Sequence, residues 1–297
     1  MANLKEVRER IKSVKNTQQI TKAMKMVSAS KLRRAQMAIT QMRPYADKLN
    51  AMLRNILSNL EGDASTSFGD ERAVEHACVV IVTSNKGLCG AFNTNVIKAA
   101  LAKINEKYAA QRAAGKLTLL PIGKKGYAYF KKRFSDCPIV DDYVLLFDDL
   151  SFDNVAQVSQ RLMDAFEEKE FDVVDVAYGR FRNAAVQYPE CVQFLPVEKL
   201  ESDGVETTKH RADYIFEPDK ETLLKHLVPS ILQTQFQKFV LDTHASEHGA
   251  RMTAMDAATE NAEELVKELK ISYNKARQEA ITKELSEIVG GAAALEG

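Results

Sequence analysis

The stretch Ala77–Asn95, ACVVIVTSNKGLCGAFNTN, decides the class of the central part of the chain. Its apolar, β-branched first half predicts a buried strand, GLCG predicts a turn, and the following segment predicts a helix. Similar elements alternate onward from this stretch. The predicted strands are 77–83, 117–122, 171–178 and 191–197, and the predicted helices are 94–111, 124–134 and 153–169. This βαβ alternation predicts a mostly parallel sheet covered by helices, a Rossmann-like α/β domain.

The two ends of the chain differ from this middle part, because they contain almost no glycine or proline and their apolar residues follow helical spacing. At the N-terminal end the predicted apolar stripe consists of Leu4, Val7, Ile11, Val14, Ile20, Met24 and Val27. Helices over the two ends would be roughly 85 and 105 Å long at about 1.5 Å per residue, too long to be buried in one domain of this size. We therefore expect an antiparallel coiled coil. The predicted segments are an N-terminal helix (1–61), the α/β domain (62–218) and a C-terminal helix (219–297).

Three polar residues, Gln18, Gln235 and Thr243, fall where this coiled coil should be apolar. They represent either ordinary irregularity or surface that contacts other subunits.

The GLCG turn resembles a phosphate-binding loop in its position but not in its residues. A Walker loop needs GxxxxGK followed by Ser or Thr, whereas Lys86 precedes the first glycine here. A dinucleotide fingerprint needs GxGxxG, and only Gly87 and Gly90 are present. A structural or interface turn is the favoured interpretation, with a nucleotide-binding enzyme as the alternative. We expect no cofactor.

Two further patterns invite a functional interpretation. His244-Ala-Ser-Glu247-His248 matches the HxxEH pattern of inverted zinc proteases, but a metal site also needs a third ligand and a dry cleft. Chance occurrence in a long helix is favoured, so no metal is expected. Residues 1–60 carry 13 Lys/Arg against 3 Asp/Glu, which indicates an acidic partner. The most prominent basic residues are Lys22, Lys25, Lys31, Arg33 and Arg34. Nucleic-acid binding and a merely solvated face are the alternatives.

Compartment and termini complete this description. The opening MANLKEVRER lacks the apolar stretch of a secretory signal, and four scattered cysteines without a CxxC pair are typical of a reducing compartment. We expect a cytosolic bacterial protein in which Cys78 and Cys191 belong to the core. The C-terminal end is apolar around Ile288, Val289 and Leu295, which is unusual for a free helix end unless something encloses it. A docked or disordered tail is the alternative.

Three stretches together resemble the gamma subunit of the F-type ATP synthase. They are LKEVRERIKSVKNTQQITKAMKMVSASKLRRAQ, SNKGLCGAFN and ARMTAMDAATENAEELVKELKISYNKARQEAITKELSEIVGGAAAL. The resemblance implies a non-catalytic rotor shaft inside a ring of three alpha and three beta subunits. It also implies a central foot domain on the c ring, beside the epsilon subunit. Proton flow would turn the shaft and drive the beta sites through their conformations. The chain would be peripheral at the cytoplasmic face of the plasma membrane, touching the membrane only indirectly, without nucleic acid.

The resemblance also implies roles for particular residues. Met24 and Lys25 would face the acidic lever of a beta subunit, and Arg251 would lie on the opposite helix in a segment coupled to the same region. Arg277, Gln278 and Thr282 would bind beta catch loops. An apolar bearing tip would consist of Ile281, Leu285, Ile288, Val289 and Leu295. Contacts of the foot with the c ring and epsilon would come from Gly87, Leu88, Cys89, Gly90, Tyr214 and Glu217.

Overall fold

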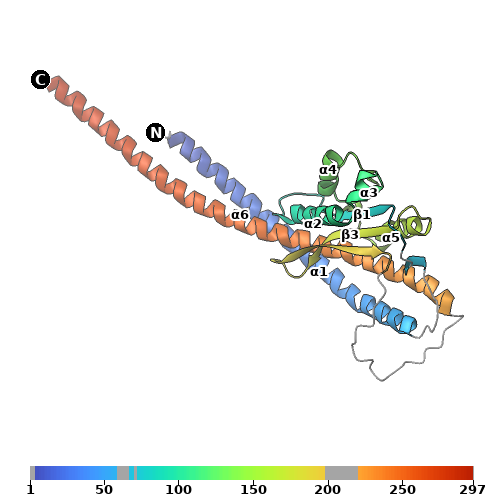
Figure 1. The fold of residues 1–297 in the computed structure, drawn as a ribbon. Coiled ribbons are helices and arrows are strands. Elements are labelled where there is room, and N and C mark those ends of the chain that lie inside the picture. Colours follow the sequence, from blue (N-terminus) through green and yellow to red (C-terminus); the bar gives the residue numbers. More distant parts are fainter. Residues whose placement is uncertain (1–3, 59–66, 70–71, 198–219, 297) are drawn as a thin grey trace. The chain divides into compact units, whose positions relative to one another are not determined.

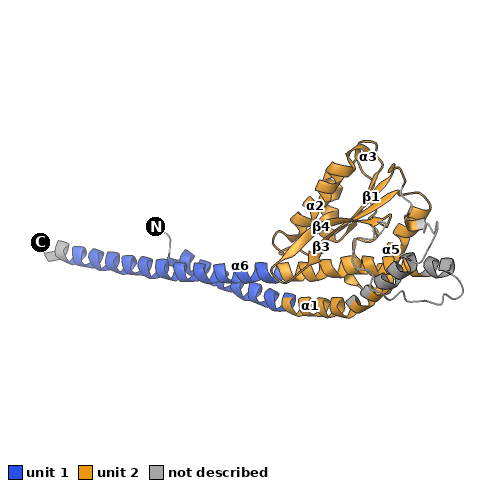
Figure 2. Cartoon of the chain, turned by 60° about the horizontal axis from the view of Figure 1, so that its bottom comes forward, with its two compact units in different colours: residues 1–28, 251–297 blue, residues 29–250 orange. Residues whose placement is uncertain are grey.

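The computed structural model describes residues 4–58, 67–69, 72–197 and 220–296. They form two compact units: residues 29–250, and residues 1–28 together with 251–297 (Figure 2). The long helices α1 (Leu4–Ser58) and α6 (Lys220–Glu296) each contribute to both units. The predicted pair of long terminal helices is therefore confirmed, and the division at 61/62 and 218/219 remains a prediction.

The unit of residues 29–250 is built on a four-stranded sheet with the order β2-β1-β3-β4 (Figure 1). Its strands are β1 (Ala77–Val82), β2 (Leu117–Ile122), β3 (Val173–Phe181) and β4 (Gln187–Leu195). Strand β1 pairs in parallel with both β2 and β3, whereas β4 is antiparallel to β3. The expected mostly parallel α/β sheet is confirmed.

The fourth strand differs in detail from the predicted range 191–197. It begins at Gln187, and only residues 182–186 separate it from β3. So short a connection can close an antiparallel hairpin but cannot make the crossover that a parallel strand requires. The Asn183 Oδ1 atom accepts hydrogen bonds from the backbone N–H groups of Ala185 and Val186, which closes this turn.

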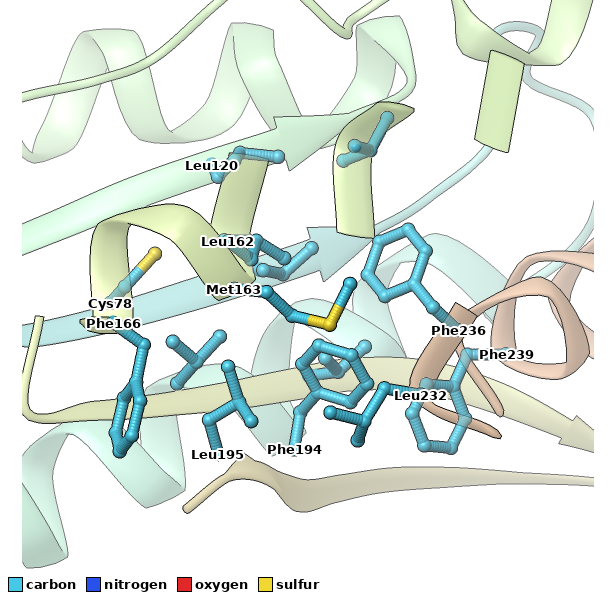
Figure 3. Close-up of a cluster of buried hydrophobic side chains, with 14 of the residues drawn as sticks. Cys78, Leu120, Leu162, Met163, Phe166, Phe194, Leu195, Leu232, Phe236 and Phe239 are labelled. Carbon is cyan, nitrogen blue, oxygen red and sulfur yellow. The ribbon is translucent and has the colours of Figure 1, made fainter. Parts of the chain in front are cut away.

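Helices cover both faces of the sheet, because alternate residues of each strand point to opposite sides. On one side Val79 and Ile81 pack against α2 (Phe92–Lys107) and α4 (Lys124–Arg133). On the other side Val80 packs into a cluster with α5 (Phe152–Glu167) and α6. Figure 3 shows this second cluster, in which side chains from the sheet, α5 and α6 interlock. The remaining short helices are α3 (Ala109–Ala113), η1 (Ser67–Gly69) and η2 (Leu146–Asp148).

The other unit is an antiparallel pair made by the first part of α1 and the last part of α6 (Figure 2). Its contact line on α1 steps by three and four residues, as in a coiled coil. The buried or half-buried residues on this line are Leu4, Val7, Ile11, Val14, Gln18, Thr21, Lys25 and Ser28. On α6 the line runs through Met255, Thr259, Ala262, Val266, Leu269, Tyr273, Ala276 and Ala280. We call these two lines the seam.

The predicted continuation of the apolar stripe through Ile20, Met24 and Val27 is wrong. Ile20 and Val27 are 59% and 58% exposed. The seam keeps the period set by Val7 and Ile11, so it passes through polar residues instead. Since each helical residue advances by about 100°, the line of Ile20, Met24 and Val27 lies roughly a third of a turn from the seam.

Candidate functional site

The GLCG turn lies at the carboxyl end of the central strand β1. Strand β2 lies on one side of β1 and β3 on the other, so this end is the switch point at which open α/β sheets usually bind ligands. Leu88 and Gly90 both adopt a left-handed backbone, with φ of 62° and 58°. Such a φ is uncommon for leucine, and Leu88 is nevertheless 64% exposed. The turn therefore presents an apolar side chain at its surface.

The polar groups of this turn bond to one another. The Ser84 N–H donates to Asn93 Oδ1 at 2.9 Å, and the Asn93 Nδ2 group donates to Cys89 Sγ at 3.1 Å. A phosphate cradle instead needs backbone N–H groups that point at the ligand. This arrangement favours the scaffold interpretation of GLCG.

The neighbouring helix α4 begins at the same edge, and its first amides are also occupied. The N–H groups of Lys124 and Gly126 donate to Asn85 Oδ1 at 3.2 Å and to Thr83 Oγ1 at 2.8 Å. The Lys125 N–H donates to the Ser84 carbonyl at 3.1 Å. These first-turn donors are the groups that a helix N-terminus offers to an anion, and here the chain itself satisfies them.

The turn also places Phe92 against the sheet, and this contact leads to α6. A methyl group added at Gly179 would lie 2.5 Å from Phe92 Cε2, so only glycine fits there. The Gly179 N–H donates to Thr243 Oγ1 at 3.2 Å, and Ser246 Oγ donates to the Gly179 carbonyl at 2.9 Å. We call Gly179, Thr243 and Ser246 the α6 joint. It explains why Thr243 is polar: its hydroxyl binds the backbone of β3.

The HxxEH pattern is part of the packed interior of this unit. His244 and His248 approach each other with 3.1 Å between their Nε2 atoms, and His244 stacks on Phe147. Glu247 and His248 are buried. In the described part of the chain, no group of three or more His, Cys, Asp or Glu side chains could hold a metal ion.

The cysteines behave as core residues. Cys78 is fully buried, and burial raises the pKa of its thiol. Cys191 is half-buried on β4, and burial raises the pKa of its thiol to about 12. The pKa of the nearby Tyr108 hydroxyl is raised in the same way, first by burial and then by the Asp175 carboxylate, to which the hydroxyl donates a hydrogen bond at 2.8 Å. Raised thiol pKa values indicate unreactive cysteines rather than nucleophiles.

The α1 surface carries the first group of predicted contact residues. We call the line of Ile20, Met24 and Val27 the outer line of α1. Met24 is half-buried on it, between exposed Ile20 and Val27. Lys25 lies in the seam instead, where its ammonium pairs with the Asp256 carboxylate. Of the basic residues singled out on this helix, Lys22, Lys31, Arg33 and Arg34 are exposed.

The C-terminal end of α6 carries the second group. Residues 281–292 are exposed on every side, and in both views this end runs past the first described turn of α1 (Figures 1 and 2). The seam line would continue here through charged residues, Lys283 and Glu287, which form an ion pair at 3.8 Å. The apolar residues lie on a different line, which is rotated from the seam line by nearly half a turn, since each helical residue advances by about 100°. They are Ile281, Leu285, Ile288 and Val289, and we call them the tip stripe.

The predicted catch-loop residues share this orientation. Arg277, Gln278 and Thr282 are exposed, and helical spacing places them on the side of α6 that carries the tip stripe. Arg251, by contrast, is buried. The Leu295 side chain, Tyr214 and Glu217 lie outside the described residues, so these predictions stay as they are.

Sequence reasoning missed the partners that Lys25 and Thr21 find on α6. Asp256 pairs with Lys25, and Thr259 Oγ1 lies 2.7 Å from Thr21 Oγ1. Extending the spacing of Val7, Ile11 and Val14 by strict steps of three and four would have found Thr21 and Lys25 in the seam.

No helix among the described residues contains a segment that is both long and apolar enough to traverse a bilayer.

Comparisons with known proteins match the whole chain. The family model described as ATP synthase matches residues 3–295. The gamma chain of ATP synthase from Flavobacterium psychrophilum is 52% identical over 298 residues, covering 100% of both chains. That from Cytophaga hutchinsonii is 50% identical over 295 residues, covering 99% of each.

A solved structure agrees with these relatives. A chain in the Euglena gracilis mitochondrial ATP synthase OSCP/F1/c-ring assembly aligns with a TM-score of 0.67 and 25% identity, covering 98% of this chain and 94% of that one. The central stalk and c-ring structure from Tetrahymena thermophila shows the same fold, with a TM-score of 0.55 and 22% identity over 80% of this chain and 99% of that one. The chain therefore belongs to the ATP synthase gamma-chain family.

Proposed function

We propose that this chain is the non-catalytic central rotor of a bacterial F-type ATP synthase. It transmits rotation between the c ring and the catalytic beta subunits, in a complex with three alpha, three beta and one epsilon subunit. The complex places it at the cytoplasmic face of the plasma membrane, as a peripheral subunit. The gamma-chain relatives and the ATP synthase OSCP/F1/c-ring assembly named above support this assignment.

One observation carries the proposal: the tip stripe is apolar, exposed and turned away from the seam. Isolated exposed apolar residues are ordinary, but a continuous line of them marks an interaction surface. Because Lys283 and Glu287 occupy the seam line at this level, the stripe does not serve to lengthen the coiled coil. It suits a surrounding apolar sleeve, in which contacts without hydrogen bonds let the helix turn.

The outer line of α1 supplies a second contact. Ile20, Met24 and Val27 form an apolar strip on a strongly basic helix, which suits a partner segment that is acidic and partly apolar. In the rotor this partner is the lever of a beta subunit. Rotation of one asymmetric chain inside a threefold ring gives each beta subunit a different contact, and so a different conformation.

Stiffness is what a rotor requires from its fold. The α6 joint and the cluster around Phe236 and Phe239 hold α6 against the sheet from residue 228 onward. A domain that holds the helix in this way can turn it as one body. In this interpretation the GLCG turn is part of the domain that packs against α6. The exposed surface of the turn, which includes Leu88, is available to the c ring or epsilon.

The proposal is tested by purifying the native complex and by charging the tip. We expect the chain to co-purify with alpha, beta and epsilon subunits. We expect Leu285→Asp with Ile288→Asp to leave urea unfolding of the chain unchanged, since both side chains are exposed, and to abolish ATP-driven proton pumping in inverted vesicles. The matched control is Ser286→Asp, an exposed residue away from the stripe. Normal pumping by the double variant, or a chain that purifies alone, would contradict the proposal.

The nucleotide-binding alternative predicts a different result. An enzyme using GLCG should bind ATP or NAD stoichiometrically in equilibrium dialysis, and the occupied amides of α4 and the Ser84–Asn93 pair argue against it. A nucleic-acid binder should instead bind DNA with a steep salt dependence through residues 1–60.

A further inference from the structure

The seam of the coiled coil is polar where it passes beneath the outer line of α1. Thr21 and Lys25 replace apolar knobs there, and they meet Thr259 and Asp256 of α6. The Thr21 and Thr259 hydroxyls lie 2.7 Å apart, and both also reach backbone carbonyls of their own helices, at Gln18 and Met255. This pair is satisfied within the seam. Within the seam, the partner of the Lys25 ammonium is therefore the Asp256 carboxylate.

Lys25 and Asp256 form their pair at the rim of the seam, with side chains 40% and 45% exposed. An ion pair this exposed contributes little to folding. Its geometric effect is larger, because a lysine has a long flexible stem and takes its charge wherever the counter-ion lies. With Asp256 present, that charge is held against α6.

We propose that Asp256 is a positioning residue, which keeps the Lys25 ammonium in the seam so that uncharged Met24 faces the partner. The inference rests on the proposed function, since it takes the outer line of Ile20, Met24 and Val27 as the surface that meets an acidic partner segment. Lys25 follows Met24 directly, about 100° further around the helix. Released from Asp256, its ammonium reaches the partner side of the helix beside Met24.

The consequence is that α1 meets the acidic partner segment at Met24 without a positive charge beside it. A cation beside Met24 attracts an acidic partner segment too strongly in one rotational position, and a rotor must leave each position as readily as it enters it. Over-stabilising one position by a charge contact slows departure from it. Asp256 prevents this by neutralising Lys25 within the chain.

The test compares variants of the complete ATP synthase in inverted membrane vesicles, measuring protons pumped per ATP hydrolysed. We expect Asp256→Asn to lower this ratio about two- to five-fold, the range that an exposed charge contact of ~0.4–1 kcal/mol supports. Combining it with Lys25→Gln should restore the ratio, because no cation is left to relocate. Exchanging the charges, with Lys25→Asp and Asp256→Lys, tests the pair in reverse and should lower the ratio less than Asp256→Asn alone.

The matched control is Glu263→Gln, which breaks the exposed Lys267–Glu263 ion pair, 3.2 Å long, on the same helix. It should leave the ratio unchanged. An unaltered ratio in Asp256→Asn overturns the inference, and so does a double variant as impaired as Asp256→Asn, since the defect would then be loss of structure.

Met24→Lys in the same series separates this inference from the proposed function. If Met24→Lys lowers the ratio and Asp256→Asn does not, the outer line is the contact surface and the role of Asp256 is wrong. If neither changes the ratio, the outer line is not the contact surface, and the inference fails with that part of the proposed function.

Discussion

Two stretches of the helix α6 are similarly provided with large apolar residues and use them in opposite ways. Between residues 228 and 250 the chain buries them against its own sheet: Phe236 packs on Phe194 with ring centroids 5.6 Å apart. Between residues 281 and 292 it buries none, and Ile288 is 68% exposed. The first stretch is covered by the chain's own domain, and in the proposed rotor the second is covered by another chain. Apolar content alone therefore does not distinguish folding residues from docking residues.

The strongest test of this contrast is a pair of alanine substitutions. Phe236→Ala removes a fully buried ring and should lower the free energy of unfolding by about 3–5 kcal/mol. Ile288→Ala removes an exposed side chain and should change it by less than ~0.5 kcal/mol. Urea unfolding of the isolated chain, followed by circular dichroism, measures both. Equal effects would mean that the tip is packed within the chain.

Gly179 and Gly290 test the same difference between the packed part of the chain and the exposed tip of α6. A methyl group at Gly179 meets Phe92, whereas one at Gly290 meets nothing within 4 Å. Gly179→Ala should destabilise the chain by about 1–3 kcal/mol through overpacking. Gly290→Ala should stabilise the helical tip by roughly 0.5–1 kcal/mol, because alanine favours a helix more than glycine does. Thermal unfolding with a helix probe reads both, and a neutral Gly179→Ala would refute the close approach of Phe92.

Two buried threonines of α6 test the joint itself. Thr243 bonds to the backbone of β3, whereas Thr234 bonds at 2.8 Å to the carbonyl of Ser230 in its own helix. Thr243→Val should cost about 1–2 kcal/mol of stability, because the Gly179 N–H loses an acceptor in a buried site. Thr234→Val should stay within ~0.5 kcal/mol. If the two costs were the same in urea unfolding, the contact with β3 would contribute nothing of its own.

The smallest expected effect is a dependence on alkaline pH. The pKa of the Cys191 thiol is raised from 9.0 to about 12 by burial, so the unfolded chain loses this proton first. Because the pKa is higher in the folded state, the contribution of this thiol to the free energy of unfolding is fully present below pH 9. That contribution is lost as the pH rises from 9 toward 12. From pH 8 to 9.5 this thiol should account for a loss of about 0.8 kcal/mol. In Cys191→Ala, the free energy of unfolding should therefore fall by that much less between pH 8 and pH 9.5. If the variant loses as much as the unmodified chain, Cys191 is not the source of the pH dependence.

Much of this architecture could be predicted from residue patterns, because its causes are local. The β-branched run at 77–82 and the lack of glycine and proline in the terminal helices determine their own elements. The direction of β4 was missed because it depends on the short connection after β3. The seam was misplaced because Ile20 and Val27 are apolar and yet exposed, and a hydrophobic pattern cannot distinguish a buried apolar residue from an exposed one.

The candidate site was predictable in part. The tip residues and Arg277 could be chosen by resemblance, and their common orientation then follows from helical spacing. The Thr243 hydroxyl and the Lys25–Asp256 pair could not be foreseen, since each depends on a residue far away in the sequence. Long-range polar contacts of this kind leave no local periodicity to detect.

The angular offset between the seam and the outer lines has a genetic consequence. In the proposed rotor each helix of the pair uses one face to fold and another face to meet the surrounding subunits, so mutations on the two faces belong to separate classes. Val7 and Val266 are buried, whereas Ile20 and Ile288 are exposed. We therefore expect changes at the first two residues to act on stability and, in the proposed rotor, changes at the last two to act on contact with partners. Selection can therefore adjust the outer faces in step with the surrounding subunits while the pair itself keeps its register.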